Sequence, residues 1–167
     1  PGGNADASDV PDADGPAPIT SAGEPQVTSD DKPKVQREFP RIEGQAGLAT
    51  TSQLRLHGWT ADTIRHRRDR TIQRVYPGVY ASHRGPLDVD TRLLAASMWA
   101  GESAVLTGRV ALDRHGLSLD SLGNCVFLVP SNRRARRARD ARTVRTGSPI
   151  SVARHHQGVP LTDVARA

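Results

Sequence analysis

The chain has 167 residues, with 23 Lys and Arg against 18 Asp and Glu, and its aromatic side chains are limited to two Trp, two Tyr and two Phe. This length allows one compact domain or two small ones, and the single Cys125 excludes an internal disulfide and a cysteine-based zinc site. No apolar run approaches the roughly 18 residues of a membrane-spanning helix, and the first residues do not resemble a signal peptide, so we expect a cytoplasmic protein without a membrane partner. Because the chain begins without Met, we also expect it to be a fragment of a longer reading frame.

Charge is distributed unevenly along the chain. Residues 1–31 contain seven acidic residues and no Lys or Arg, and residues 1–38 as a whole are rich in Pro, Gly, Ala, Asp and Ser. This composition predicts a disordered acidic tail, either a solubilising linker or a segment that competes with DNA for a basic face. Residues 39–167 contain 20 Arg, no Lys and 10 acidic residues. Such an excess of positive charge indicates a polyanionic partner, and Arg matches phosphate groups and guanine edges particularly well.

Order is expected to begin near Phe39. Phe39, Ile42 and Ala46 have helical spacing and predict a short helix that follows Pro40 and ends at Gly47.

A second helix is predicted from residue 51 to the His57-Gly58 pair, with Thr50 or Thr51 as its cap. Its Leu54 and Leu56 are expected to face inward.

The third predicted helix is strongly basic. Trp59 is expected to pack across the preceding turn, and Thr60 to cap the helix. At about 100° per residue, the inward sector contains Ala61, Ile64 and Arg68, and the opposite sector is polar. A hairpin follows, formed by residues 72–75 and 79–82 around Pro77-Gly78, which specify a type II turn.

A helix, a tight turn, a basic helix and a hairpin in this order predict a winged helix-turn-helix DNA-binding domain over residues 39–84. The alternative is a charged helix that is merely solvated. The side chains expected to contact DNA are Thr51, Thr60, Thr63, Arg65, His66, Arg67, Arg70, Arg74 and Arg84.

Residues 85–117 are predicted to be a helical linker region. Val89, Leu93, Ala96 and Ala100 form an apolar stripe on a helix that Gly101 ends, and Thr107 is expected to cap a further helix that runs to His115.

Residues 118–167 are predicted to form a small, truncated mixed α/β unit, which gives an α+β fold overall. Strands are expected at residues 125–129, 143–145 and 151–155, with Cys125 as a small core residue and a helix starting at Thr162.

An arginine-rich loop lies between the first two of these strands. Within it, five of the seven residues from 133 to 139 are Arg: Arg133, Arg134, Arg136, Arg137 and Arg139. Like charges at this density need solvent or anions, so the loop is a candidate for a second DNA contact. Contact with an acidic partner, or simple exposure to solvent, are the alternatives.

Catalytic motifs are not evident. His155 and His156 are adjacent on a predicted strand and would point to opposite faces, with only Asp163 as an acidic neighbour in sequence. The sequence contains no phosphate-binding loop, nucleophile elbow or carboxylate pair. We therefore expect no enzyme activity, no metal site and no cofactor.

Several segments resemble the N-terminal half of AbiEi-type antitoxins of type IV toxin-antitoxin systems, a family of bacterial transcription regulators. They are GLATTSQL at residues 47–54, GW at 58–59, IRHR at 64–67, RVYPGVYA at 74–81, GPL at 85–87 and AGESAVL at 100–106. The resemblance implies a repressor that binds its own promoter and antagonises a nucleotidyltransferase-like toxin. Some relatives instead carry an endonuclease-like domain downstream, so a DNA-targeting part of such a protein is the alternative.

Overall fold

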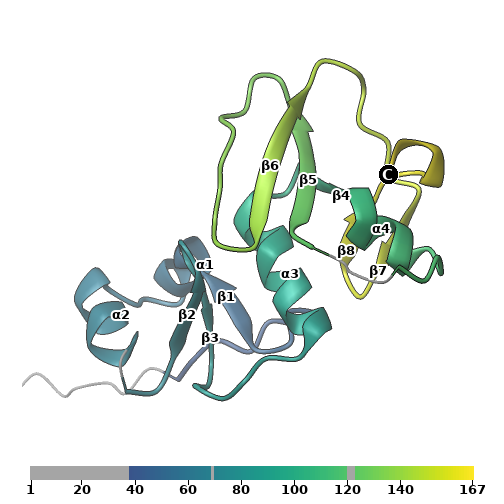
Figure 1. Ribbon diagram of the computed structural model, residues 1–167. Coiled ribbons are helices and arrows are strands. Elements are labelled where there is room, and N and C mark those ends of the chain that lie inside the picture. Colours follow the sequence, from purple (N-terminus) through teal and green to yellow (C-terminus); the bar gives the residue numbers. More distant parts are fainter. Residues whose placement is uncertain (1–37, 69, 120–122) are drawn as a thin grey trace, which may run out of the picture. The chain divides into compact units, whose positions relative to one another are not determined.

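The computed structural model describes residues 38–68, 70–119 and 123–167. These residues belong to one compact unit with a mixed α+β fold. It contains two sheets, with helices between and after their strands along the chain (Figure 1). The acidic tail predicted for residues 1–38 lies, apart from its last residue, outside the described residues.

The first part of this unit is a three-stranded antiparallel sheet with two short helices. The sheet has the order β1-β3-β2, and both helices lie between β1 and β2 in the chain. A small core of Ala49, Leu54, Trp59, Ile64 and Ile72 joins the helices to the sheet. The elements are β1 (Leu48–Thr50), α1 (Thr51–Leu56), α2 (Ala61–Arg68), β2 (Gln73–Tyr76) and β3 (Val79–Ala81).

The helix predicted before Gly47 is wrong, because the backbone turns there instead. Gly44, Ala46 and Gly47 have φ angles of 71°, 47° and 74°, which belong to the left-handed region and cannot continue a right-handed helix. Phe39 and Ile42 nevertheless pack on the small core. The spacing of Phe39 and Ile42 therefore identified two side chains that pack on the core, but the helix that it predicted does not form.

Helix α1 begins where the sequence predicted. The Oγ1 of Thr50 accepts from the Gln53 N–H at 3.2 Å, and the Gln53 Oε1 accepts from the Thr50 N–H at 2.8 Å, which together form a capping box. Leu54 is fully buried, but Leu56 is 86% exposed, which corrects its expected inward position. Two residues span about 200° on a helix, so the two leucines cannot share one face.

The predicted hairpin is confirmed as β2 and β3, joined by Pro77-Gly78. Gly78 has a φ of 83°, as a type II turn requires. The N–H and the hydroxyl of Thr51 both donate to the Gly78 carbonyl, at 2.8 Å and 3.3 Å. The turn is therefore fastened to the start of α1 and does not project from the sheet.

The second part is a five-stranded mixed sheet with the order β6-β5-β4-β8-β7 (Figure 1). The β5/β6 and β4/β8 pairs are parallel, and the β4/β5 and β7/β8 pairs are antiparallel. Its elements, with the helices around it, are α3 (Val89–Ala100), β4 (Val105–Thr107), α4 (Gly108–Arg114), β5 (Cys125–Pro130), β6 (Ala141–Thr146), β7 (Arg154–His156), β8 (Val159–Leu161) and the 3-10 helix η1 (Val164–Arg166).

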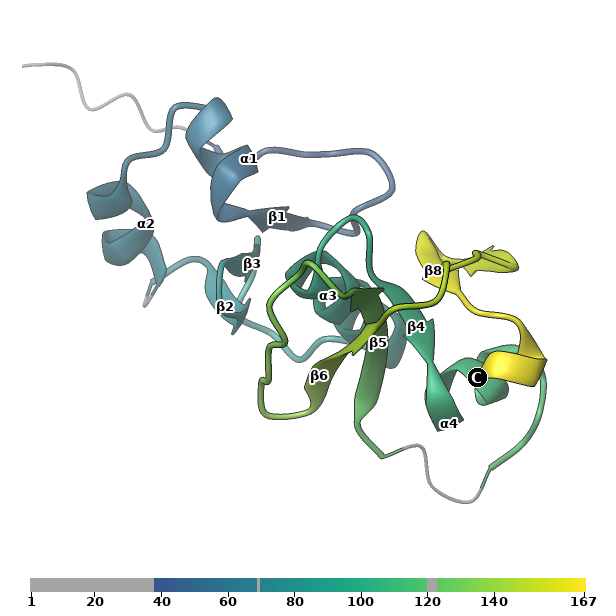
Figure 2. The same cartoon turned by 90° about the horizontal axis from the view of Figure 1, so that it is seen from above.

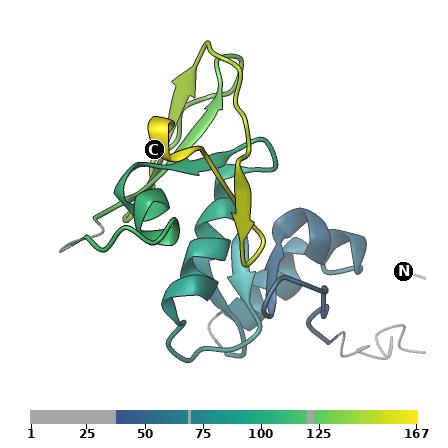
Figure 3. The same ribbon diagram turned by 90° about the vertical axis from the view of Figure 1, so that its right-hand side faces the viewer.

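Helix α3 connects the two sheets and contacts strands of both (Figures 1 and 2). The main hydrophobic core accordingly contains Leu48 and Val79 from the first sheet, Trp99 from α3, and Phe127 and Leu161 from the second sheet. Figure 3 shows the β7–β8 hairpin reaching alongside α3. Residues 85–117 are therefore not only a helical linker, because α3 and β4 both build the core.

Several details of the second part correct the sequence predictions. Strands β4 and β8 were not expected, and β7 begins at Arg154 instead of Ser151. Val89 is 63% exposed and does not join the apolar stripe. Thr107 precedes α4 but makes no capping bond, because its hydroxyl donates to the Arg166 carbonyl at 3.0 Å. The helix expected from residue 162 is the short 3-10 helix η1.

The two leucines of α1 provide a matched test of this packing. Leu54→Ala is expected to lower the free energy of unfolding by about 2–5 kcal/mol, because it leaves a cavity under α1. Leu56→Ala deletes the same side-chain atoms at a solvent-exposed position, and is expected to change the free energy of unfolding by less than about 0.5 kcal/mol. Urea unfolding of both variants checks the register, and equal losses would contradict it.

Candidate nucleic-acid interface

Helix α2 is the most basic helix of the described chain and begins with a side-chain cap. The Thr60 Oγ1 accepts from the Thr63 N–H at 3.1 Å, as predicted, and the two hydroxyl oxygens lie 2.9 Å apart. Asp62 occupies the first turn, where a negative charge is favourable. The hydroxyls of Thr60 and Thr63 are thus already used in the cap, although Thr60 is exposed.

The outer side of α2 carries polar and charged side chains. Arg65 forms an ion pair with Asp62, with both side chains more than two-thirds exposed, and such a pair contributes little to stability. The Nδ1 of His66 lies 3.3 Å from the Asp62 carbonyl oxygen. His66 is exposed, as the predicted register requires. Arg70 was predicted to lie on the same helix, but α2 ends at Arg68, and Arg70 is an exposed residue of the turn that follows.

The inner side of α2 differs from the prediction. Ile64 is buried, but Ala61 and Arg68 are exposed, so they do not form part of a packed face. Arg67, which was expected to contact DNA, lies with its guanidinium 5.0 Å from the centre of the Trp59 ring and is half-buried. This cation–π contact gives Arg67 a structural role that helical periodicity alone did not indicate.

The remaining predicted contacts of the first part have different environments. Arg74 on β2 and Arg84 after β3 are exposed. Thr51 is half-buried, and its hydroxyl donates to the Gly78 carbonyl.

The arginine-rich loop connects β5 to β6, and part of it folds back on β6. The Arg136 N–H donates to the Thr143 Oγ1 at 2.7 Å, and the Thr143 N–H donates to the Arg136 carbonyl at 2.9 Å. Arg137 forms an isolated bridge with Arg142. The side chains of Arg133, Arg134, Arg137 and Arg139 are exposed.

Arg136 is also an exposed residue, but unlike the other four its guanidinium group contacts the protein. Its Nη1 donates to the Trp99 carbonyl at 2.7 Å, and its guanidinium lies 5.0 Å from the centre of the Trp99 ring. On the same ring, Tyr76 stacks at 5.8 Å with an interplanar angle of 28°. Arg136 thus fastens the loop to α3.

A polar contact joins the first sheet to the end of the same loop. The Tyr76 hydroxyl donates to the Asp140 Oδ1 at 2.7 Å. Burial, and then this bond to a carboxylate, raise the pKa of Tyr76 far above its usual range, so the phenol stays protonated. Burial also raises the pKa of the nearby Cys125 to about 11, with the Asp140 charge as the second cause. Cys125 is therefore a neutral, half-buried thiol near pH 7.

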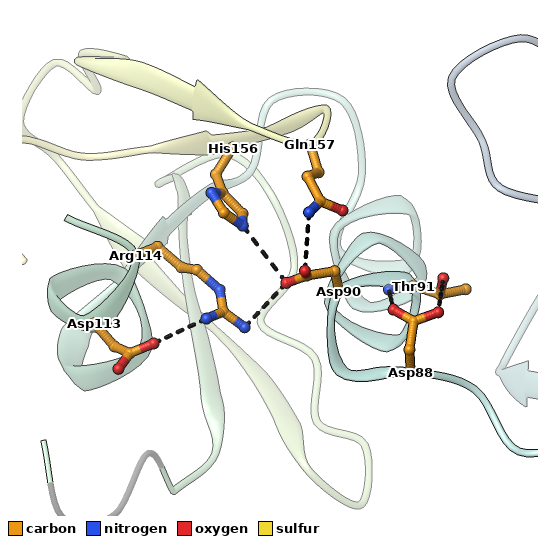
Figure 4. A network of polar contacts seen from close by, with 7 residues as sticks. All are labelled: Asp88, Asp90, Thr91, Asp113, Arg114, His156 and Gln157. Atoms are coloured by element: carbon orange, nitrogen blue, oxygen red, sulfur yellow. Dashed lines mark hydrogen bonds and ion pairs between the residues drawn. The ribbon is translucent and has the colours of Figure 1, made fainter. Parts of the chain in front are cut away.

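A separate cluster of charges links α3, α4 and β7 (Figure 4). Arg114 contacts Asp90 at 3.0 Å and Asp113 at 2.9 Å, and the Gln157 amide donates to Asp90 at 2.9 Å. The His156 Nε2 lies 3.5 Å from Asp90, a neighbour that sequence spacing did not reveal.

His155, in contrast, is exposed, so the two histidines do point apart. In the parts of the chain that the structure describes, no three His, Cys, Asp or Glu side chains are grouped as a metal site would need. We interpret the Asp90 cluster as a structural ion-pair network.

The same figure shows the cap of α3. The Asp88 carboxylate accepts from the Thr91 N–H at 2.8 Å and from the Thr91 hydroxyl at 2.6 Å, and these bonds lower the pKa of Asp88.

The chain matches no protein-family model. No curated protein is significantly similar to it. Within the described residues, no helix combines the length and the apolar character that crossing a membrane requires.

The different environments of Arg136 and Arg134 lead to a stability prediction. Arg136→Ala removes a hydrogen bond and a cation–π contact, and is expected to lower the free energy of unfolding by about 1–2 kcal/mol. Arg134→Ala, an exposed neighbour in the same loop, is the control and is expected to have the stability of the wild type. Thermal unfolding of both variants checks this. An unchanged Tm for Arg136→Ala would show that Arg136 does not stabilise the fold.

Proposed function

We propose that the protein binds double-stranded DNA through a winged helix-turn-helix formed by residues 39–84, with α2 in the major groove. The observation that carries the proposal is the two-sided character of α2. Its inner side is anchored by Ile64 and by the stack of Arg67 on Trp59, whereas its outer side exposes His66, and the turn that follows the helix exposes Arg70. A helix held in this way can present donors to base edges without rearranging the core.

The connectivity supports the same proposal. In a winged helix, a strand leads into two helices and then into a hairpin whose second strand pairs with the first strand. The succession of β1, α1, α2, β2 and β3, with the sheet order β1-β3-β2, has that connectivity. The hairpin turn is short and bound to Thr51, so we assign the reading of bases to α2 and not to the wing.

The positive charge outside α2 suits the DNA backbone. Arg133, Arg134 and Arg137 are exposed in a loop of the second sheet, and such side chains position a protein on phosphates without reading the sequence. Arg84 follows β3 and can act in the same way.

We further propose, from the resemblance to AbiEi-type antitoxins, that the DNA is the protein's own promoter and that binding represses transcription in the cytoplasm. A nucleotidyltransferase-like toxin is the proposed protein partner. We propose no catalytic activity for this chain.

The role of α2 is tested by fluorescence anisotropy with the native upstream promoter and a scrambled duplex of equal length. His66→Ala and Arg70→Ala are expected to lower the ratio of the two affinities, by up to the equivalent of about 1–3 kcal/mol for each base contact. Arg154→Ala on β7 is the control for loss of one exposed positive charge, and the ratio should be unchanged. The proposal fails if the wild type binds both duplexes equally. If the wild type discriminates and both variants retain its full discrimination, α2 does not read the bases.

A further inference from the structure

We propose that a groove beside β2, which we call the arginine groove, binds the phosphate groups of a nucleic-acid strand. It is lined by residues 73–77 of β2 and its turn, residues 85–87, Arg92 of α3, and residues 138–140 before β6, and its volume is about 830 Å³. Three separate segments thus each bring one arginine to one groove: Arg74, Arg92 and Arg139. Arg92 had not been expected to contact a ligand.

The three arginines are available for a ligand. All three side chains belong to exposed residues. Across residues 38–68, 70–119 and 123–167, none of these three takes part in the ion pairs described above, whose basic members are Arg65, Arg114 and His156. The single carboxylate in the lining is that of Asp140, which already accepts the Tyr76 hydroxyl. The groove therefore has an excess of positive charge that an anion would offset.

The walls of the groove are held by contacts that leave the arginines free to bind. The Gln73 amide donates to the Gly85 carbonyl at 2.7 Å and fixes the segment after β3 against β2. On the other side, the bond from Tyr76 to Asp140 holds residues 138–140 close to the same strand. The segments that carry the arginines are thus held together before a ligand arrives, which lowers the entropy lost on binding.

Phosphate is the chemical class that fits this lining. A guanidinium group offers paired donors that match two phosphate oxygens, and it remains charged at every physiological pH. The groove is also an open surface between four segments, as a strand with successive phosphates would require, and not an enclosed apolar cavity. The phosphates can come from a duplex bound at α2 or from a free oligonucleotide.

A duplex at α2 would be close to the groove. Arg70 after α2 and Arg74 in the groove are separated only by residues 71–73, and Arg70 is the last residue that we assign to reading bases. The duplex form of this inference rests on the proposed function. The free-oligonucleotide form does not.

The first experiment measures binding to a scrambled duplex over a salt series. The double variant Arg92→Gln/Arg139→Gln is expected to bind more weakly and to flatten the log–log salt slope by about two units, because about 0.9 unit is lost for each phosphate contact. The control is Arg145→Gln/Arg154→Gln, which removes the same charge from exposed sites on β6 and β7. Equal effects of the two double variants, or a wild-type slope for the first, would overturn the duplex form.

The second experiment separates the source of the phosphate. Tetrathymidylate and inorganic phosphate are titrated into the wild type and into Arg92→Gln/Arg139→Gln by calorimetry. If the wild type binds tetrathymidylate and the groove variant does not, free oligonucleotides are identified as ligands. A salt-slope effect without such binding identifies the duplex backbone, and the absence of both effects overturns the inference.

The two proposals fail in different ways. Loss of groove function leaves the ratio of promoter to scrambled affinity unchanged, because phosphates carry no sequence information. If the wild type binds no duplex, the proposed function falls, and the groove survives only through arginine-dependent binding of tetrathymidylate. If His66→Ala lowers discrimination while the groove variant behaves as the wild type, the inference falls and the proposed function stands.

Discussion

The stack of Tyr76 and Arg136 on Trp99 is the contact on which the rest of the structure depends. Tyr76 comes from the hairpin of the first sheet, Trp99 from α3, and Arg136 from the loop between β5 and β6. Tyr76 also donates to Asp140 at the end of that loop. One side chain thus couples the first sheet to both α3 and the second sheet. Because this loop joins two parallel strands without a helix, these contacts replace the packing that a crossover helix usually provides.

The arginines of this chain have three different roles, which their chemical identity does not reveal. Arg67 and Arg136 each lie over a Trp ring and help to build the fold. Arg65 and Arg114 pair with carboxylates. Others, such as Arg74, are exposed without an ion pair, and on these a ligand can act. A positively charged surface is therefore better described by its unpaired guanidinium groups than by net charge, since the stacked and paired ones are already engaged.

The candidate site could be predicted in part because its signals are local. The Thr60 cap and the exposure of His66 follow from capping preferences and from the 3.6-residue repeat, both of which act within a few residues. The 3.6-residue repeat gave the wrong position for two arginines: Arg68 was predicted to face inward and is exposed, whereas Arg67 was predicted to flank the outer side and packs on Trp59. With so few apolar residues on α2, an aromatic ring from outside the helix determined which arginine packs inward.

Elements with short-range causes could be predicted from the sequence: the start of α1 near Thr50, the Pro77-Gly78 turn, and the end of α3 at Gly101. Which distant residues meet, in contrast, depends on the tertiary fold. No spacing rule places Arg92 and Arg139 at one groove, or Asp90 beside His156, because such arrangements depend on the order of strands and on loop closure. For the same reason β4 and β8 were missed: each is only three residues long and is stabilised mainly by its partners in the sheet.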